Sequence, residues 1–333
     1  MNSLRIIFLK WIAPLAILLS CSESTELQRV DLNGNAFGTR FSITYFDTEN
    51  RDFTIAIDSL FNGINQSLST YIPASDISRI NNGDTTVVVD YYFEEVFNKS
   101  KKIYEETNGI FDPTIGNLVN AWGFGPENYQ KALDSAQVDS VLHRVGFDKV
   151  RLHKGKIFIK FPHIYFDFNA IAKGYAVDVA GRFLEQNKIE HYLVEIGGEI
   201  RSRGQQPERN AAWQVAIENP NFDGTRSIEK IINLENEAMA TSGSYRKFKI
   251  DSTGRKYSHI ISTITGYPVK NNLLSVSVIG QRDCADLDAY ATALMAMSLT
   301  EAKTFFANNK TLKGHIIFTD DENKLATYST PNL

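Results

Sequence analysis

The spacing of hydrophobic positions predicts helices mixed with strands along most of the chain. Apolar and polar residues alternate around Phe41, Ile43 and Tyr45, as is typical of a half-buried strand. Apolar residues recur at helical spacing over residues 57–68, 93–104, 172–184 and 285–297. Shorter apolar runs predict strands over residues 156–161, 164–168, 191–196 and 316–318, with the first two forming a hairpin. This order of elements favours an α+β or α/β fold.

The N-terminus has the pattern of an export signal. Arg5 and Lys10 precede an apolar run over residues 11–19, and Ser20 and Cys21 follow it. The run is shorter than the roughly 20 residues of a spanning helix. Residues 18–21 resemble the bacterial lipobox, so residues 1–20 are predicted to be a lipoprotein signal peptide, with lipid on Cys21. An ordinary secretory signal is the alternative.

This interpretation divides the chain into three parts. After the signal peptide, residues 21–34 are polar and without periodicity, which is typical of a tether. Residues 35–333 contain no internal repeat or linker and are predicted to form one large domain. The expected location is the cell membrane, with the domain lipid-anchored and facing the periplasm, in a leaflet that the sequence does not specify.

Composition and charge remove several classes of function. The net charge is −4 and the basic residues are scattered, so no nucleic-acid partner is expected. The six histidines and two cysteines lack the spacing of zinc ligands. The chain also lacks a Walker loop, a Gly-x-Gly-x-x-Gly turn and a Gly-x-Ser-x-Gly elbow, so the common nucleotide-binding and hydrolase folds are unsupported.

Two clusters of polar residues could bind a metal ion or a phosphate group. Asp288 and Thr292 are four residues apart on a predicted helix, so their oxygens share one face and could bind Mg²⁺. Asp167 ends a predicted strand, and Lys173 lies in the first turn of the following helix, where backbone amides attract phosphate. The structural alternatives are a solvent-facing Asp with a back-bonded Thr, and a strand-to-helix connection with a surface lysine.

Glycines and aromatic residues suggest where a flat ligand could bind. Gly197 and Gly198 interrupt a strand-like run, which allows close approach of a ligand or indicates a bulge. Tyr71 and Trp122 lie beside turns and could stack on a ring or cover a core. His259 is an imidazole outside any zinc pattern, which leaves it available as a proton acceptor.

The order of these motifs resembles the FAD:protein FMN transferase family, also called ApbE. Residues 172–178, Ala-Lys-Gly-Tyr-Ala-Val-Asp, carry the most recognisable string. The resemblance extends over residues 38–41, 68–71, 78–81, 111–114, 122–125, 197–198, 240–243, 258–261 and 265–266, and over Asp288 and Thr292. The chain departs from the family pattern at Phe37, where many members have methionine, and at Ser262 and Thr263, where many have Asp-Pro.

The resemblance implies a single α+β domain, ApbE-like and T-fold-related, with mixed sheets and packed helices. It implies FAD as substrate and Mg²⁺ as cofactor, the metal held by the Ala170 carbonyl, Asp288 and Thr292. The residues implied to contact FAD are Phe37, Tyr71, Ala121, Trp122, Gly123, Asp167, Lys173 and His259. His259 is also the candidate general base.

The implied reaction transfers FMN from FAD to a Ser or Thr hydroxyl of an acceptor protein and releases AMP. The implied partners are flavoprotein subunits of membrane electron-transfer complexes, such as the Na⁺-translocating NADH:quinone reductase. Two alternatives remain open: an FAD pyrophosphatase, in which water replaces the hydroxyl, and a flavin-binding lipoprotein that carries FAD without chemistry.

Overall fold

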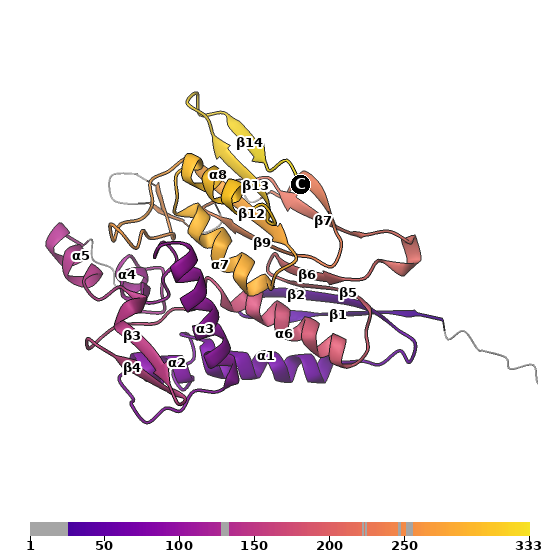
Figure 1. Cartoon of the computed structure of the whole chain (residues 1–333), viewed down its shortest axis with the longest axis horizontal. Helices are drawn as coiled ribbons and strands as arrows, with labels where there is room; N and C mark the ends of the chain where they lie inside the picture. The colour runs from indigo at the N-terminus through magenta and orange to yellow at the C-terminus, as the bar shows by residue number, and fades with distance from the viewer. Residues whose placement is uncertain (1–25, 128–132, 222, 224, 246–247, 251–255) are drawn as a thin grey trace, which may run out of the picture.

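An eight-stranded antiparallel sheet is the centre of the protein (Figure 1). The computed structural model describes residues 26–127, 133–221, 223, 225–245, 248–250 and 256–333. The strands of the sheet, in spatial order, are β1 (Gln28–Ala36), β2 (Thr39–Asp47), β5 (His191–Ile196), β6 (Glu199–Arg203), β9 (Ala238–Gly243), β12 (Leu273–Gly280), β13 (Lys313–Thr319) and β14 (Leu325–Ser329). Strands β1 and β14 form its two edges.

Helices and three two-stranded sheets surround this central sheet. The helices are α1 (Thr54–Leu68), α2 (Asp76–Asn81), α3 (Tyr91–Glu106), α4 (Gly116–Ala121), α5 (Ser135–Leu142), α6 (Ala172–Gln186), α7 (Cys284–Met295) and α8 (Leu299–Asn308), with short 3₁₀ turns at Phe147–Lys149 and Pro207–Arg209. The small sheets pair β3 (Val150–His153) with β4 (Lys156–Ile159), β7 (Trp213–Glu218) with β8 (Ile228–Leu234), and β10 (Phe248–Ile250) with β11 (Lys256–Ser258). Among the described residues, none of the helices combines the length and apolar character needed to cross a bilayer.

The two faces of the sheet bury two different cores, as the period of two along a strand requires. On β9, Ala238 and Ala240 belong to the core under the helices, whereas Met239 between them belongs to the core under the β7–β8 hairpin. On β13, Ile316 and Ile317 divide in the same way. Figure 1 shows α6 and α7 along the sheet, and their ends position the site described below.

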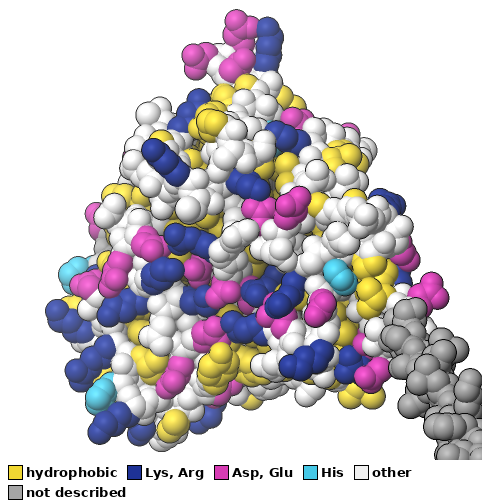
Figure 2. Space-filling view, turned by 45° about the vertical axis from the view of Figure 1, so that its right-hand side comes forward, with side chains coloured by type: hydrophobic (Ala, Val, Ile, Leu, Met, Phe, Trp, Pro, Cys, Tyr) yellow, Lys and Arg dark blue, Asp and Glu magenta, His cyan; other side chains and the backbone are white. Residues whose placement is uncertain are grey.

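The periodicity predicted most of the long elements correctly. The helices expected over residues 57–68, 93–104, 172–184 and 285–297 are α1, α3, α6 and α7, and the strands at 191–196 and 316–318 are β5 and β13. The α+β class is confirmed by this mixture of helices and antiparallel sheets. Figure 2 shows acidic and basic side chains interspersed across one face of the molecule.

The expected hairpin over residues 156–168 is wrong in its partner. Residues 156–159 form β4 but pair with β3, which precedes them, through a turn at Lys154 and Gly155 with positive φ at both positions. Residues 164–168 lie outside every named strand, and Tyr165 forms one isolated parallel bridge to Ile115. Phe166 and Phe168 are buried, so their hydrophobicity reflects packing in the core rather than sheet pairing.

The fold also begins earlier than the predicted boundary at residue 35. Strand β1 starts at Gln28 and pairs with β2 along its whole length, from Gln28 opposite Asp47 to Ala36 opposite Thr39. As an edge strand it buries little, and Leu32 is its one fully buried side chain. A weak apolar signal is expected for such a strand, which explains why residues 28–34 resembled a tether.

Candidate functional site

Helices α6 and α7 meet backbone to backbone at Gly174, in the first turn of α6. A Cβ atom on Gly174 would lie 2.5 Å from the carbonyl oxygen of Cys284 and 2.8 Å from the amide nitrogen of Ala285. Both distances are far shorter than van der Waals contact, so this approach requires glycine. The start of α6 is therefore fixed against the start of α7.

We expect Gly174→Ala to lower the free energy of unfolding by about 1–3 kcal/mol, because the methyl group must separate two helix backbones. Urea denaturation measures the difference. Gly63→Ala in α1 is the matched control, since its Cβ would meet the side chain of Tyr92 at 3.1 Å rather than a backbone. Equal stability of the two variants would contradict the steric argument.

Asp288 points toward the start of α6 and accepts a hydrogen bond from one of the backbone amides there. Its carboxylate is buried, and Oδ2 accepts a hydrogen bond of 3.1 Å from the amide of Gly174. Gly174 lies in the first turn of α6, where backbone amides have no partner within the helix, so the carboxylate caps this end of α6. Among the described residues, no backbone amide donates to the Ala170 carbonyl. The carbonyl of Ala170, two residues before α6, therefore has acceptor capacity.

Thr292 lies one turn beyond Asp288 on the same face of α7. Its Oγ1 lies 3.0 Å from Oγ of Ser242, near the end of β9. One carboxylate, one hydroxyl and one carbonyl make a hard-oxygen donor set of the kind that suits Mg²⁺. Within the described ranges there is no cluster of three or more His, Cys, Asp or Glu side chains that could hold a metal.

Lys173 lies between two buried carboxylates. Its Nζ is 2.6 Å from Oε2 of Glu199, a residue that is only 1% exposed. Burial opposes the charged lysine, but the carboxylates of Asp288 and Glu199 outweigh it and hold the pKa of Lys173 above its ordinary value. Burial raises the pKa of both acids, while Lys173 acts in the opposite direction. Two acids and one lysine therefore form a coupled group at the start of α6.

Two tight turns lie side by side at this end of the sheet. Gly197 and Gly198 connect β5 to β6, and both have positive φ, so the doublet is a hairpin turn rather than the strand interior that the sequence suggested. The amide of Gly197 donates to the carbonyl of Arg40, 3.0 Å away. A Cβ on Gly197 would lie 2.7 Å from Cγ2 of Thr39. The second turn, at Phe37, is therefore a direct neighbour.

Phe37 occupies the first position of the β1–β2 turn with a φ of 52°. A left-handed conformation costs a bulky residue about 1–2 kcal/mol, so the position is under strain. The ring packs edge-on against Phe61, with centroids 5.3 Å apart. An open cleft of about 680 Å³ runs along the turn and is lined by residues 35–40 and Asn65. Phe37 is thus held at the wall of a cleft.

Tyr71 and Asp167 form a second part of the candidate site. Tyr71 is 58% exposed after the end of α1, although the shielding of its hydroxyl and the carboxylate of Asp167 raise its pKa. Asp167 is mostly buried, and its Oδ1 accepts a 2.8 Å bond from the amide of Asn169. Asp167 lies six residues before Lys173 in the chain and leads into α6, and its charge acts on Tyr71 from a distant part of the sequence.

Trp122 and His259 belong to an aromatic group beyond α4. Trp122 follows Ala121, the last residue of α4, and its Nε1 donates to the carbonyl of Gly266 at 2.8 Å. Its ring contacts the rings of Tyr257 and Tyr267. Phe124 contacts Tyr257 as well and lies 6.2 Å from His259 between centroids. The chain turns at Gly123, whose φ is 75°.

The segment after His259 is well fixed although it departs from the family pattern. Ser262 donates its amide to the carbonyl of Tyr267 at 2.9 Å, and its hydroxyl accepts from the amides of Ile264 and Thr265. The hydroxyl of Thr263 donates to the carbonyl of Gly109 at 2.8 Å. A hydroxyl-capped turn therefore closes this loop without the Asp-Pro pair.

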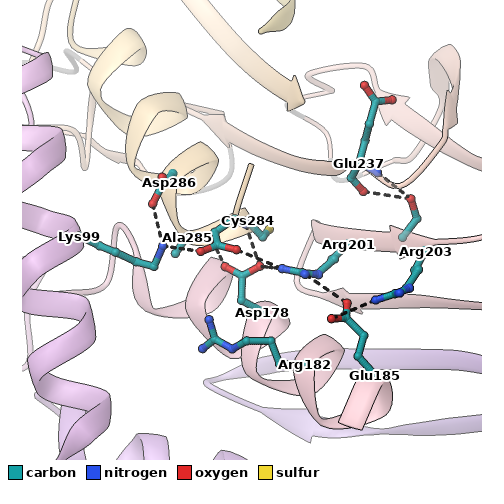
Figure 3. A network of polar contacts seen from close by, with 12 residues as sticks. Lys99, Asp178, Arg182, Glu185, Arg201, Arg203, Glu237, Cys284, Ala285 and Asp286 are labelled. Carbon is teal, nitrogen blue, oxygen red and sulfur yellow. Dashed lines mark hydrogen bonds and ion pairs between the residues drawn. The ribbon is translucent and has the colours of Figure 1, made fainter. Parts of the chain in front are cut away.

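A polar network holds the first turn of α7 (Figure 3). Asp178 of α6 is fully buried, and its two oxygens accept 2.9 Å bonds from the amides of Cys284 and Ala285. Arg201 of β6 pairs with the same carboxylate at 2.8 Å. Burial and the neighbouring Asp283 raise the pKa of Asp178 to about 6, although Arg201 favours the charged form. Asp178 thus caps α7 from a different helix.

The sequence pattern placed predicted FAD-binding and metal-binding residues at the starts of α6 and α7 but did not indicate two acids there. Glu199, directly after the glycine doublet, is not among the predicted site residues, and Asp178 belongs to the 172–178 motif without an assigned role. The signal for Asp178 was its spacing of four from Gly174, which places both on the face of α6 that meets α7. Glu199 could have been found from its place directly after two glycines. That inference requires the glycines to be read as a turn and not as part of a strand.

Solved structures that share this fold are flavin transferases and other ApbE proteins. The solved structure of the flavin transferase ApbE from Vibrio cholerae has a TM-score of 0.80 at 31% identity, covering 92% of this chain and 98% of that one. The ApbE protein from Thermotoga maritima has a TM-score of 0.80 at 26% identity, covering 92% of this chain and 98% of that one.

Sequence relatives agree with the structural ones. The FAD:protein FMN transferase of Haemophilus influenzae is 32% identical over 317 residues, or 91% of this chain and 90% of that protein. The protein of the same name from Vibrio cholerae is 33% identical, over 93% of each chain. The sequence model of the ApbE family matches residues 37–316. The chain belongs to the ApbE family.

Proposed function

We propose that this protein is an FAD:protein FMN transferase. The observation that carries the proposal is the α6–α7 junction, where Asp288 bonds the amide of Gly174 and its charge acts on Lys173, the residue before. A lysine and hard oxygens together suit a diphosphate with a bound divalent cation. The names of the relatives identify the diphosphate as that of FAD.

FAD would bind along the residues that the family resemblance assigned. Lys173 would contact the diphosphate, and Asp167 would lie beside it. The aromatic residues Tyr71 and Trp122, with Phe37 at the cleft, would offer flat surfaces to the ring systems. The remaining assigned contacts are Ala121, Gly123 and His259. Strain at Phe37 supports a role for that turn, because strained backbone gathers at functional sites.

The residues present fit a magnesium ion held by Asp288, Thr292 and the Ala170 carbonyl. The fit rests on the buried carboxylate of Asp288 and on the carbonyl of Ala170, to which no backbone amide donates among the described residues. When bound, Mg²⁺ would offset the charge of the diphosphate. Asp288 would supply the negative charge of this set. The Thr292 hydroxyl and the Ala170 carbonyl would supply neutral oxygen ligands.

The reaction exchanges the phosphoanhydride bond of FAD for a phosphoester bond to the acceptor. The acceptor's Ser or Thr oxygen would form a bond to the FMN-side phosphorus, and the bond from that phosphorus to the bridging oxygen would break. AMP would leave with the bridging oxygen, and the hydroxyl proton would pass to a base. Lys173 would stabilise charge on the phosphoryl oxygens. His259 is the candidate base, because an imidazole can accept a proton near neutral pH.

The proposed acceptors are flavoproteins, and the finer assignment is to subunits of membrane electron-transfer complexes of the Na⁺-translocating NADH:quinone reductase type.

The proposed location is the cell membrane, with lipid on Cys21 and the domain facing the periplasm. Cys21 and the signal peptide lie outside the described residues. We expect full-length protein in the membrane fraction of a bacterial host, and Cys21→Ala protein to be lost from that fraction; membrane-bound Cys21→Ala would contradict the anchor.

Mass spectrometry of an acceptor tests the activity directly. The mature domain would be incubated with FAD, with and without Mg²⁺, and with a flavoprotein acceptor that carries the target hydroxyl. A metal-dependent gain of one FMN per acceptor is the expected result. Release of AMP without a mass gain would establish a pyrophosphatase instead, and unchanged FAD would indicate a carrier.

We expect Lys173→Met to weaken FAD binding about tenfold, as is typical when a hydrogen bond to a charged group is lost. Quenching of flavin fluorescence measures the affinity. Lys313→Met is the matched control, because Lys313 also pairs with a buried glutamate, Glu237, at 2.7 Å, and neither residue is assigned to the site. Equal FAD affinity in the two variants would remove Lys173 from the binding site.

A further inference from the structure

Glu199 is a buried acid whose position is set by a rigid hairpin. It is the first residue of β6 and stands opposite Ile196 across the two-glycine turn. The amide of Gly198 donates to Oε1 of Glu195 at 2.7 Å, and the amide of Gly197 donates to Arg40. A carboxylate with 1% exposure is costly unless it is paired. Its pairing with Lys173 is therefore a fixed feature of the fold.

Lys173 has a second carboxylate within its electrostatic reach. The next residue, Gly174, donates its backbone amide to Asp288. The backbone of Lys173 is therefore close to that carboxylate. The direct ion pair of Lys173 is nevertheless with Glu199, at 2.6 Å. An ammonium paired with Asp288 would occupy the carboxylate that a divalent cation needs. The site contains one lysine and two acids, and it matters which acid holds the lysine.

We propose that Glu199 is a positioning residue that holds the Lys173 ammonium away from Asp288. The carboxylate of Asp288 is thereby kept free for a divalent cation, while the ammonium stays at the edge of the site, where a diphosphate oxygen can meet it. This inference rests on the proposed function, which assigns Asp288 to the metal and Lys173 to FAD. It adds a residue, Glu199, that is assigned to contact neither FAD nor the metal.

A double-mutant cycle separates this role from a simple effect of charge. Mn²⁺ affinity would be measured by electron paramagnetic resonance, without FAD, for the wild type, Glu199→Gln, Lys173→Met and the double variant. Glu199→Gln is expected to weaken Mn²⁺ binding about tenfold, because Lys173 moves onto Asp288. Removing Lys173 should then strengthen Mn²⁺ binding about tenfold more in the Glu199→Gln background than in the wild type, a coupling in the usual range for contacting residues.

Additivity would overturn the inference. If Lys173→Met changes Mn²⁺ affinity by the same factor in both backgrounds, Glu199 acts only through its charge. Glu237→Gln is the matched control, since it breaks another buried glutamate–lysine pair and should leave Mn²⁺ affinity unchanged. Glu199→Asp keeps the charge and shortens the side chain, so it should fall between wild type and Glu199→Gln and serves if Glu199→Gln unfolds.

A different result would identify failure of the proposed function itself. If the wild type binds no Mn²⁺, with or without FAD, the metal assignment is wrong and the inference falls with it. If the wild type binds Mn²⁺ and the cycle is additive, the metal assignment stands and the role of Glu199 is refuted. Thermal unfolding of each variant shows whether lost binding reflects lost structure.

Discussion

Asp288→Asn is expected to lower the rate of FMN transfer about a thousandfold. The variant removes the only charged group assigned to the metal, so metal binding weakens and the reacting phosphoryl group loses electrostatic stabilisation. The asparagine oxygen can still accept the hydrogen bond from the amide of Gly174. Burial raises the pKa of Asp288, so the charged form is disfavoured in the metal-free fold and thermal stability should not fall. Acceptor mass spectrometry over time measures the rate.

Thr292 provides a matched pair of variants for the same site. Thr292→Ser keeps the hydroxyl and should stay within severalfold of the wild-type rate, whereas Thr292→Val keeps the shape and should lose most of the activity. Full activity in Asp288→Asn would remove the metal assignment. Equal rates for the serine and valine variants would remove Thr292 alone.

Asp178→Ala is expected to lower the free energy of unfolding by about 3–5 kcal/mol, the usual cost of removing one partner of a buried ion pair. The loss arises from the groups left behind: the guanidinium of Arg201 loses its buried partner, and the amides of Cys284 and Ala285 lose their acceptor. Urea denaturation measures the change.

The control for Asp178 is Glu185, one of two other acids that pair with Arg201. Glu185 lies 3.2 Å from the guanidinium but is 25% exposed at its side chain, so Glu185→Gln should cost less than about 1 kcal/mol. A similar loss in both variants would show that Arg201 needs any nearby acid rather than the cap on α7. A loss below 1 kcal/mol in Asp178→Ala would contradict the capping argument.

The sequence predicted the long helices because their apolar faces are regular. Helices α6 and α7 were predicted within one or two residues at their starts, and the motif around Lys173 identified the family. The Asp288 and Thr292 spacing correctly placed both side chains on one face of α7. These features depend on neighbours within a few residues, which is the range over which periodicity carries information.

Features that depend on distant pairing were not predictable in the same way. The ion pair of Lys173 with Glu199 joins residues from a helix and a strand, and nothing in the local spacing of either indicates the other. Residues 164–168 resembled a strand because two buried phenylalanines alternate there, although the segment packs against α3 through Phe93. Strand β1 was missed because an edge strand needs few apolar residues.

The start of β1 at Gln28 limits how far the domain can stand from a membrane. With lipid on Cys21, as proposed, seven residue steps join the anchor to the sheet, and no arrangement of that segment can exceed about 25 Å. A fold beginning at residue 35 would have allowed about twice that distance. The short segment would therefore keep the enzyme close to the bilayer. Only acceptor hydroxyls near the membrane surface would come within its reach.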